Sequence, residues 1–452
     1  MMRLNELLPM KTQWACVLCL CTSLSMNAQA FDLQAAWDAA LGYDASHSAA
    51  AYQRLAAQEN IPQARAALLP QVSLNGSYQR NYPIEPEADS NNSYGYSVQA
   101  TQTLFDASKY ADYKQGKLAA KLADAQFDLS EQQLLLNVSQ AYFDVLTAYD
   151  LISASKASKT LYERQLEQAK TMFDVGAATI VDTHEAQAGL DNAQVQVLNA
   201  EQKLHLAQQK LEYYTGLNPV DIERIDGKQV NRILNRKTLA EWQQLAYLSN
   251  TNISAKHLAV EQAQAAVQKA KANRYPTVEL QAAYQDQHQQ VSNMGFSENV
   301  HNKGASIGVN LSMPLYTGGA LSSQVRQTQF ELLQREDELT ASKRDTDLQV
   351  REQYLNVQSG LAQVNALEQL VLTNRKKLES SQLGQQVGVR SNLDVIDAQR
   401  TLAESEQQLA KARYDYLQAQ LALAQAAGQL QTGEALHQIN AAIRQQPLRK
   451  TP

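Results

Sequence analysis

The chain has 452 residues, of which 40 are Lys or Arg and 46 are Asp or Glu, so its formal net charge at pH 7 is −6. Ala, Gln and Leu dominate the composition, whereas Gly and Pro account for only 18 and 10 residues, a bias that favours long helices. The acidic balance gives no support for nucleic-acid binding.

Residues 1–30 have the pattern of a secretory signal peptide. A basic start leads into the short apolar run WACVLCLC at residues 14–21, and the segment ends in NAQA, an A-x-A cleavage signal. A retained membrane anchor is the weaker interpretation, because the apolar run is too short to span a bilayer. Lipidation at Cys21 is also disfavoured, because bacterial lipoprotein signals have a small residue before the cysteine and Leu20 stands there.

The cysteines and the apolar runs limit what the rest of the chain can be. All three cysteines (Cys16, Cys19 and Cys21) lie in the predicted signal peptide, so the mature chain forms no disulfide and no cysteine-ligated metal site. No run of 18 apolar residues follows residue 30. A mature chain that crosses a membrane must therefore do so as a β-barrel.

An internal duplication organises the chain. The stretch LPQVSLNGSYQR (69–80) returns as YPTVELQAAYQD (275–286). QAYFDV (140–145) aligns with EQYLNV (352–357), 212 positions later. Self-similarity at a fixed offset indicates two copies of one structural plan.

The duplication predicts the domain boundaries. We expect two structural repeats, at residues 31–216 and 239–430, each with a helix, a strand, a loop, a strand, a very long helix, a hairpin tip and a further helix. Residues 217–238 join the two repeats, and residues 431–452 form a polar tail.

Four segments alternate between apolar and polar residues. The apolar positions are Val72, Leu74, Tyr78, Tyr94, Tyr96, Val98, Ala100 and Leu104 in the first half and Val278, Leu280, Ala282, Tyr284, Ala305, Ile307, Val309, Leu311, Met313 and Leu315 in the second. Such segments of about ten residues, with Tyr near the ends, are typical of transmembrane barrel strands, although a soluble sandwich alternates in the same way. The signal peptide and the shortage of other strands favour the membrane interpretation. Since closed membrane barrels begin at about eight strands, two copies of the chain would supply eight and three would supply twelve.

Heptad patterns predict long helices. The seams of two helices are Leu190, Ala193, Val197, Ala200, Leu204, Ala207, Leu211 and Tyr214, and Leu402, Ser405, Leu409, Ala412, Tyr416, Ala419, Leu423 and Ala426. The helices that precede them are expected at about residues 107–173 and 318–385, each about 100 Å long at 1.5 Å per residue. Helices of this length indicate a rod or tube that could bridge the bacterial periplasm.

Both long helical patterns break at Val-Gly. The breaks read VGAATIVDTHEA (175–186) and VGVRSNLDVIDA (387–398). Gly ends the incoming helix and tolerates the turn, and Asp182 and Asp394 lie in the first turn of the outgoing helix, where a carboxylate suits the helix dipole. Each break is therefore expected to be the turn of a helical hairpin.

The duplication, the strand-to-helix junction MPLYTGG (313–319) and the paired Val-Gly turns make residues 31–430 resemble the outer-membrane efflux protein family, the TolC-like exit ducts. The resemblance implies a mixed α and β fold, in which a homotrimer forms a twelve-stranded outer-membrane barrel that continues as an α-helical coiled-coil barrel in the periplasm. It further implies an export channel, embedded in outer-membrane lipid, that works with a periplasmic adaptor protein and an inner-membrane transporter. No enzymatic activity and no cofactor or metal are implied.

The resemblance also implies functional residues at the two tips. The second hairpin would close the pore, with rings of Asp394 and Asp397 at the constriction and Arg390 tying neighbouring helices together, partnered by Asp182 of another subunit. Adaptor docking is implied at four hairpin positions, namely Val175, Gly176, Val387 and Gly388. Where some family members have a Tyr that helps to lock the closed tip, this chain has Gln385.

Other classes of function fit the sequence less well. An enzyme is disfavoured, because His184 and Glu185 lack the second His of a zinc-protease helix and neither a P-loop nor a G-x-S-x-G motif is present. A trimeric coiled-coil surface adhesin would not need the duplication. Within the favoured class, export of small toxic compounds and export of a type I secreted polypeptide remain equally open, and the loops at 83–93 and 287–303 are expected to face outside the cell.

Overall fold

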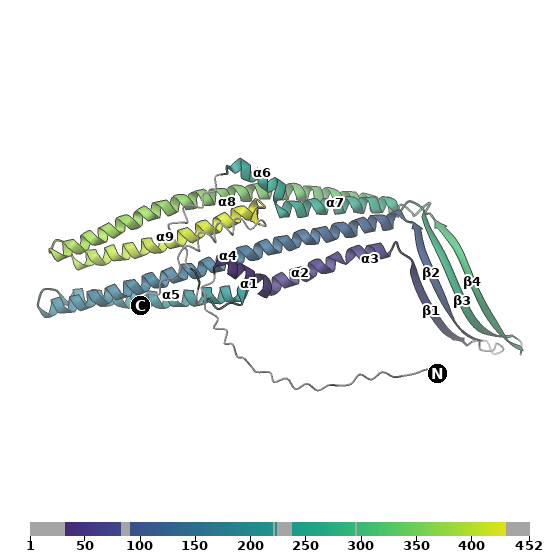
Figure 1. Cartoon of the computed structure of the whole chain (residues 1–452), viewed down its shortest axis with the longest axis horizontal. Coiled ribbons are helices and arrows are strands. Elements are labelled where there is room, and N and C mark those ends of the chain that lie inside the picture. Colours follow the sequence, from purple (N-terminus) through teal and green to yellow (C-terminus); the bar gives the residue numbers. More distant parts are fainter. Residues whose placement is uncertain (1–31, 83–90, 220–221, 224–236, 294–295, 431–452) are drawn as a thin grey trace, which may run out of the picture.

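The computed structural model describes residues 32–82, 91–219, 222–223, 237–293 and 296–430. The expected signal peptide and polar tail lie outside these residues, as does most of the expected joining segment. The molecule is elongated, with a curved sheet at one end and paired helices that run from it to two hairpin tips at the other end (Figure 1). Among the described residues, no helix combines the length and the apolarity needed to cross a membrane.

The elements follow a similar order in the two halves of the chain. The first half contains α1 (Leu33–Tyr43), α2 (Ala45–Gln58), α3 (Asn60–Ala66), β1 (Gln71–Asn81), β2 (Asn91–Phe105), α4 (Ala107–Asp174) and α5 (Ile180–Thr215). The second half contains α6 (Leu239–Ser249), α7 (Thr251–Ala272), β3 (Thr277–Asn293), β4 (Phe296–Ser312), α8 (Ala320–Gln386) and α9 (Asn392–Ala426). The two very long helices, α4 and α8, therefore begin and end within two residues of their expected bounds.

The four strands form one antiparallel sheet in the order β1-β2-β3-β4, so the pairing of β2 with β3 joins the two halves. The predicted apolar positions share one face, since Val72 lies opposite Ala100, Ala100 opposite Ala282, and Ala282 opposite Ile307. This face is exposed on the edge strands β1 and β4 and half-buried along much of the inner strands, and the helices of the same chain do not cover it.

Three details of the expected strands were wrong. Residues 287–303 were expected to form a loop, but β3 continues to Asn293 and β4 begins at Phe296. The alternation assigned Leu104 to the apolar face, but a bulge between Thr103 and Phe105 places Phe105 opposite Val278. Such a bulge adds one unpaired residue and so shifts the alternation. Met313 and Leu315 were assigned to the last strand, but β4 ends at Ser312.

The helices form an extended layer of pairs. The half of α4 that is near the sheet packs against α2, α3 and α7, and the half near the tip packs against α5. In the same way α8 packs against α6 and α7 and then against α9, and α4 packs against α9, so that α5 and α8 flank the layer near the tips. The predicted heptad seams of α5 and α9 are buried or half-buried throughout, which confirms them as packing surfaces.

The largest core lies where α4 and α9 meet. Tyr142 and Phe143 of α4 pack edge to face with ring centroids 6.2 Å apart, and Phe143 stacks on Tyr414 of α9 at 6.1 Å, with Leu417 and Leu421 in the same cluster. Full burial of side chains of this size stabilises a fold by about 1.5–3 kcal/mol each. The Tyr142 hydroxyl donates to the Glu223 carbonyl at 2.8 Å, and burial raises its pKa well above the ordinary value.

Candidate functional site at the helical tips

Both hairpin tips end their incoming helix in the same way. Val175 caps α4, Gly176 follows with a φ of +76°, and the Ala177 N–H donates to the Met172 carbonyl at 2.8 Å. At the second tip, Val387 caps α8, Gly388 has a φ of +79°, and the Val389 N–H donates to the Gly384 carbonyl at 2.9 Å. A left-handed residue followed by this six-to-one hydrogen bond is the Schellman termination, which favours Gly because no Cβ opposes a positive φ.

Each outgoing helix begins with a capping box. The backbone N–H and the hydroxyl of Thr179 both donate to Asp182 Oδ2 at 2.7 Å, and the Asp182 N–H donates back to Thr179 Oγ1 at 3.3 Å. These bonds, the one from the hydroxyl first, lower the pKa of the Asp182 carboxyl. Asp182 therefore has a structural role as the third helical residue of this capping box.

The second tip repeats this arrangement. The Ser391 N–H and hydroxyl each donate to Asp394 Oδ2 at 2.9 Å, and the Asp394 N–H donates to Ser391 Oγ at 3.2 Å. The bond from the Ser391 N–H, followed by that from its hydroxyl, lowers the pKa of Asp394, and Arg390 contributes in the same direction. Thr179 and Ser391 were not identified from the sequence, although Ser or Thr followed three residues later by Asp or Glu, before a helical pattern, predicts a capping box.

The candidate constriction residues each have an arginine of their own chain nearby. Arg390 Nη1 lies 3.6 Å from Asp394 Oδ1, and Arg400 Nη2 lies 3.3 Å from Asp397 Oδ1. All four side chains are between two-fifths and two-thirds exposed, so the two ion pairs are open to exchange with other partners. Arg400 was not found from the sequence, and its only signal was the i,i+3 spacing from an acidic residue.

The structure brings some of the predicted residues together and leaves others apart. Arg390 and Asp394 are in contact within one hairpin, whereas Asp182 belongs to the other hairpin and is bonded to Thr179. In this single chain the nearest described partner of Arg390 is thus Asp394. Gln385 is half-buried, and its carbonyl accepts the Gly388 N–H at 3.0 Å.

Apolar side chains are exposed at both tips. Val175 and Val387 are 73% and 67% exposed, and their neighbours Val181 and Val389 are exposed as well. A Cβ added at Gly176 or Gly388 would meet no heavy atom within 4 Å, so both turns have open space beside them. Contiguous exposed apolar surface of this kind commonly marks a protein interaction site.

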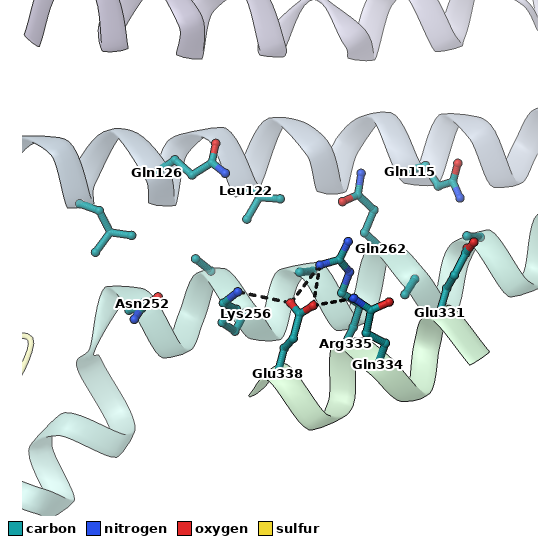
Figure 2. Close-up of a pocket in the computed structure, with 15 residues that line it drawn as sticks. Gln115, Leu122, Gln126, Asn252, Lys256, Gln262, Glu331, Gln334, Arg335 and Glu338 are labelled. Atoms are coloured by element: carbon teal, nitrogen blue, oxygen red, sulfur yellow. Dashed lines mark hydrogen bonds and ion pairs between the residues drawn. The ribbon is translucent and has the colours of Figure 1, made fainter. Parts of the chain in front are cut away.

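A polar cluster lies far from the tips, in a groove lined by α4, α7 and α8 (Figure 2). Glu338 accepts hydrogen bonds from Arg335 at 2.9 and 3.1 Å and from Gln334 at 3.0 Å, and Lys256 of α7 reaches it at 3.3 Å. Arg335, Gln334 and Lys256 lower the pKa of Glu338, with Arg335 the main cause. The Glu338 carboxylate thus bonds to two residues of its own helix, and its ion pair with Lys256 joins α8 to α7.

Comparison with known proteins places this geometry in a family. A family model described as outer membrane efflux protein matches residues 37–217 and 242–429. The chain belongs to the outer membrane efflux protein family. As a member of this family it is an outer-membrane protein that extends into the periplasm, and members are outer-membrane channels rather than enzymes.

Relatives of this outer membrane efflux protein extend over almost its whole length. The outer membrane protein TolC of Vibrio cholerae serotype O1 is 30% identical over 430 residues, which cover 93% of this chain and 96% of that protein. The alkaline protease secretion protein AprF of Pseudomonas aeruginosa is 29% identical, with 88% of this chain and 84% of that protein covered. Among solved structures, VceC from Vibrio cholerae superposes with a TM-score of 0.71 over 88% of this chain and 96% of its own, at 21% identity, which shows a shared fold.

Proposed function

We propose that three copies of this chain form an export channel across the outer membrane, which is gated at its periplasmic tip and works with an adaptor protein and an inner-membrane transporter. One observation carries the proposal. The sheet bears a continuous exposed apolar face, with Val72 and Leu74 of β1 both 71% exposed and Ile307 and Leu311 of β4 77% and 66% exposed. A face of this size on a soluble single chain would be unfavourable, whereas lipid accommodates it.

The edges of the sheet support assembly into a closed barrel. In the described sheet β1 pairs only with β2, and β4 pairs only with β3, so each has one edge without a strand neighbour. Because consecutive strands are antiparallel, β4 of one copy and β1 of the next would also be antiparallel. Three copies would close twelve strands and remove every edge.

The helical layer supports the same assembly. Its flanking helices expose apolar side chains, including Val195 and Leu198 on α5 and Leu370 and Leu372 on α8. Side-by-side packing of α5 from one copy against α8 from the next would cover these residues. The same rotation that closes the sheet would then close a helical tube, as expected for a cyclic trimer.

In this assembly the second hairpin is proposed as the gate. Three copies of Asp394 and Asp397 would place six carboxylates around the tip, which would favour cations and oppose anions. Arg390 is proposed to hold the closed tip, through Asp394 of its own chain or Asp182 of the neighbour. Val175, Gly176, Val387 and Gly388 are proposed as the adaptor docking surface, since apolar side chains and open turns coincide there.

The cargo is either a small toxic compound or a type I secreted polypeptide. AprF and a second relative, PrtF of Dickeya chrysanthemi, which is 26% identical, are named as protease secretion proteins, whereas BepC of Brucella suis is named as an efflux protein. Deletion of the gene separates the two: greater sensitivity to toxic compounds supports efflux, and loss of one protein from the culture medium supports secretion.

Cysteine pairs across the expected contact between β4 and β1 test the assembly. All three native cysteines lie within residues 1–30, so a disulfide formed elsewhere in the chain must come from the introduced cysteines. Ser73→Cys in β1 would be combined in turn with Ser306→Cys, Gly308→Cys or Asn310→Cys in β4. One register should give covalent species that end at three chains on a non-reducing gel.

A matched control comes from an inner strand. Ser97→Cys lies in β2, which is already paired on both sides. Its combinations with the same three β4 positions should therefore give no covalently linked dimer or trimer on the gel. A ladder that ended at two chains, continued beyond three, or failed to form at any register would contradict the trimer.

A further inference from the structure

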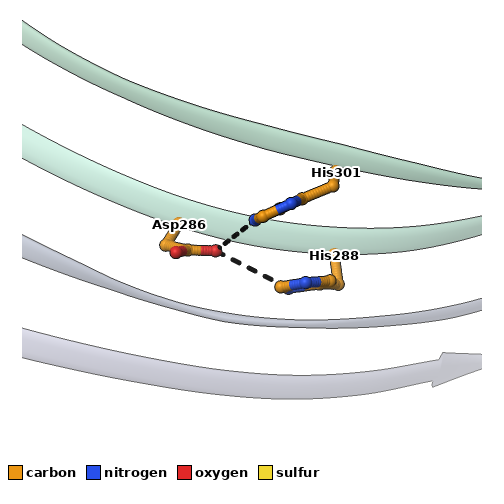
Figure 3. A group of neighbouring side chains, drawn as sticks. All are labelled: Asp286, His288 and His301. Carbon is orange, nitrogen blue, oxygen red and sulfur yellow. Dashed lines mark hydrogen bonds and ion pairs between the residues drawn. The ribbon is translucent and has the colours of Figure 1, made fainter.

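The apolar face of the sheet ends in a polar cluster at the end away from the helices. Asp286 and His288 follow Tyr284 along β3, and they lie opposite Lys303 and His301 of β4 on the same face. Asp286, His288 and His301 lie together over these two strands (Figure 3). A carboxylate with two imidazoles is unexpected directly after the apolar positions Ala282 and Tyr284 of this face.

The three side chains converge on one point. Asp286 Oδ1 accepts a hydrogen bond from His301 Nε2 at 2.8 Å and lies 3.6 Å from His288 Nδ1. One ligand atom from each residue lies within 4.8 Å of the other two. Ligand atoms at about 2.1 Å from a tetrahedral metal ion are about 3.4 Å apart, so small side-chain rotations would be sufficient to bring all three onto one ion.

The surroundings hold the three groups in place. The two imidazole rings stack at 3.9 Å with an angle of 17° between their planes, and Tyr94 of β2 stacks on His288 at 4.9 Å and 2°. The Asp286 side chain is only 12% exposed, whereas the imidazoles are 41% and 48% exposed. The carboxylate therefore forms the floor of the site, and the side facing away from the sheet remains open for water ligands.

We propose that Asp286, His288 and His301 bind one divalent transition-metal ion per chain, of the Zn²⁺ class. Imidazole nitrogen with a carboxylate oxygen is a ligand set typical of Zn²⁺, Ni²⁺ and Cu²⁺, and Mg²⁺ or Ca²⁺ would call for more oxygen ligands. The ion would tie β3 to β4 close to where the two strands join, between Asn293 and Phe296. The site lies within one chain, so it depends neither on the trimer nor on the gate.

One neighbour opposes a cation. Lys303 Nζ lies 3.9 Å from Asp286 Oδ2, and its side chain is 60% exposed. Its positive charge repels a dication and competes for the carboxylate. Replacing Lys303 by a neutral residue should therefore tighten binding, an effect that misfolding cannot produce.

Titration calorimetry with Zn²⁺ on the full-length protein in detergent, purified without a histidine tag, tests the proposal. We expect one saturable Zn²⁺ site per chain, and loss of that site in Asp286→Asn, His288→Gln and His301→Gln. His257→Gln is the matched control, because His257 is also exposed beside a carboxylate, that of Glu261 at 3.3 Å, but has no second imidazole described beside it. Co²⁺ added in place of Zn²⁺ should give a visible absorption band that the same three variants abolish.

The outcome for Lys303→Gln decides between a metal site and a simple ion-pair cluster. The proposal expects about three- to tenfold tighter Zn²⁺ binding from removal of one nearby positive charge. If wild type binds no more Zn²⁺ than the three ligand variants, or if His257→Gln loses as much as they do, the proposal is overturned. Unchanged elution volume of each variant would show that its fold is retained.

Discussion

Gly384 and Arg390 fit against each other at the second tip. The Arg390 N–H donates to the Gly384 carbonyl at 3.2 Å, and a Cβ on Gly384 would lie only 2.6 Å from Arg390 Cγ. At the first tip the same backbone bond joins Ala178 to Met172, also at 3.2 Å. The two tips therefore have the same backbone conformation, but the large residue of the pair comes first at the first tip (Met172, then Ala178) and second at the second tip (Gly384, then Arg390). The glycine leaves room for the arginine.

Gly384→Ala should widen the tip at the proposed gate. The added methyl group would displace Arg390 and separate it from Asp394, to which it lies at 3.6 Å. We expect a larger single-channel conductance in a planar bilayer, similar to that of Arg390→Ala. In the double variant Gly384→Ala/Arg390→Ala the severe contact with Cγ is removed and only the Cβ of residue 390 stays close, at 3.3 Å, so its conductance should be close to that of Arg390→Ala alone. A further increase in the double variant would show that Gly384 acts on something other than Arg390.

Asp394→Asn/Asp397→Asn should abolish cation selectivity. The two carboxylates supply negative charge at the proposed constriction, so neutralising them should bring the ratio of cation to anion permeability close to one. The measurement is the reversal potential under a salt gradient. Asp174→Asn is the matched control, because Asp174 is a carboxylate at the end of α4 in the other hairpin and has no part in the proposed gate. If the control lost selectivity to the same extent, the constriction would not be specific to the second hairpin.

The capping boxes should lose their stabilising effect in acid. The pKa of Asp182 and that of Asp394 are lowered in the folded tips from a value of 3.8. A carboxyl whose folded pKa is depressed contributes stability above its unfolded pKa and loses that contribution as the pH falls through the folded pKa. Amide hydrogen exchange at the start of α5 and α9, corrected for intrinsic rates, should therefore speed up below about pH 4.

Removing one cap provides the control for the acid effect. Thr179→Ala should make exchange at the start of α5 faster at neutral pH, at a cost of about 1 kcal/mol, and should reduce its pH dependence there, because only the backbone N–H of residue 179 would still donate to Asp182. The start of α9, capped by Ser391, should be unaffected. Equal pH dependence with and without Thr179 would assign the effect to other groups.

Adaptor binding should depend on the valines of the two turns. Val175→Asp and Val387→Asp each place a charge on surface that is about 70% exposed and apolar, so we expect weaker binding of the cognate adaptor without loss of the folded channel. Affinity can be measured by surface plasmon resonance on the purified channel. Val387→Ile, which keeps the apolar surface, should bind as wild type does. Full binding by both aspartate variants would place the adaptor elsewhere.

Periodicity predicted most of the architecture correctly. Heptads located α5 and α9 because a helix that packs along one stripe must repeat apolar residues every three or four positions, and Ala193 and Leu409 are indeed buried. Alternation located the four strands because successive side chains of a strand point to opposite faces of the sheet, so a sheet with one apolar face repeats apolar residues at every second position. It could not locate the bulge at Leu104, because an extra strand residue leaves no compositional signal.

The side-chain contacts at the tips and at the end of the sheet were harder to predict from the sequence. The capping boxes at Thr179 and Ser391 follow a local rule and could have been found from the sequence. The close fit of Gly384 with Arg390 depends on the path of the backbone through a turn, and the proximity of Asp286, His288 and His301 depends on strand register. Spacing along the chain predicts neither relationship.

The exchanged side-chain sizes at the two turns have a consequence for how a tube of such chains could open. In a ring of three chains, six hairpins would alternate between a Met172–Ala178 kind and a Gly384–Arg390 kind. Among the described residues only the second kind has an arginine–carboxylate ion pair, so in the proposed gate three hairpins would move while the three between them stay in place. The exchange of side-chain sizes between the corresponding turns of the two halves would thus separate the moving hairpins of the proposed gate from the hairpins that support them.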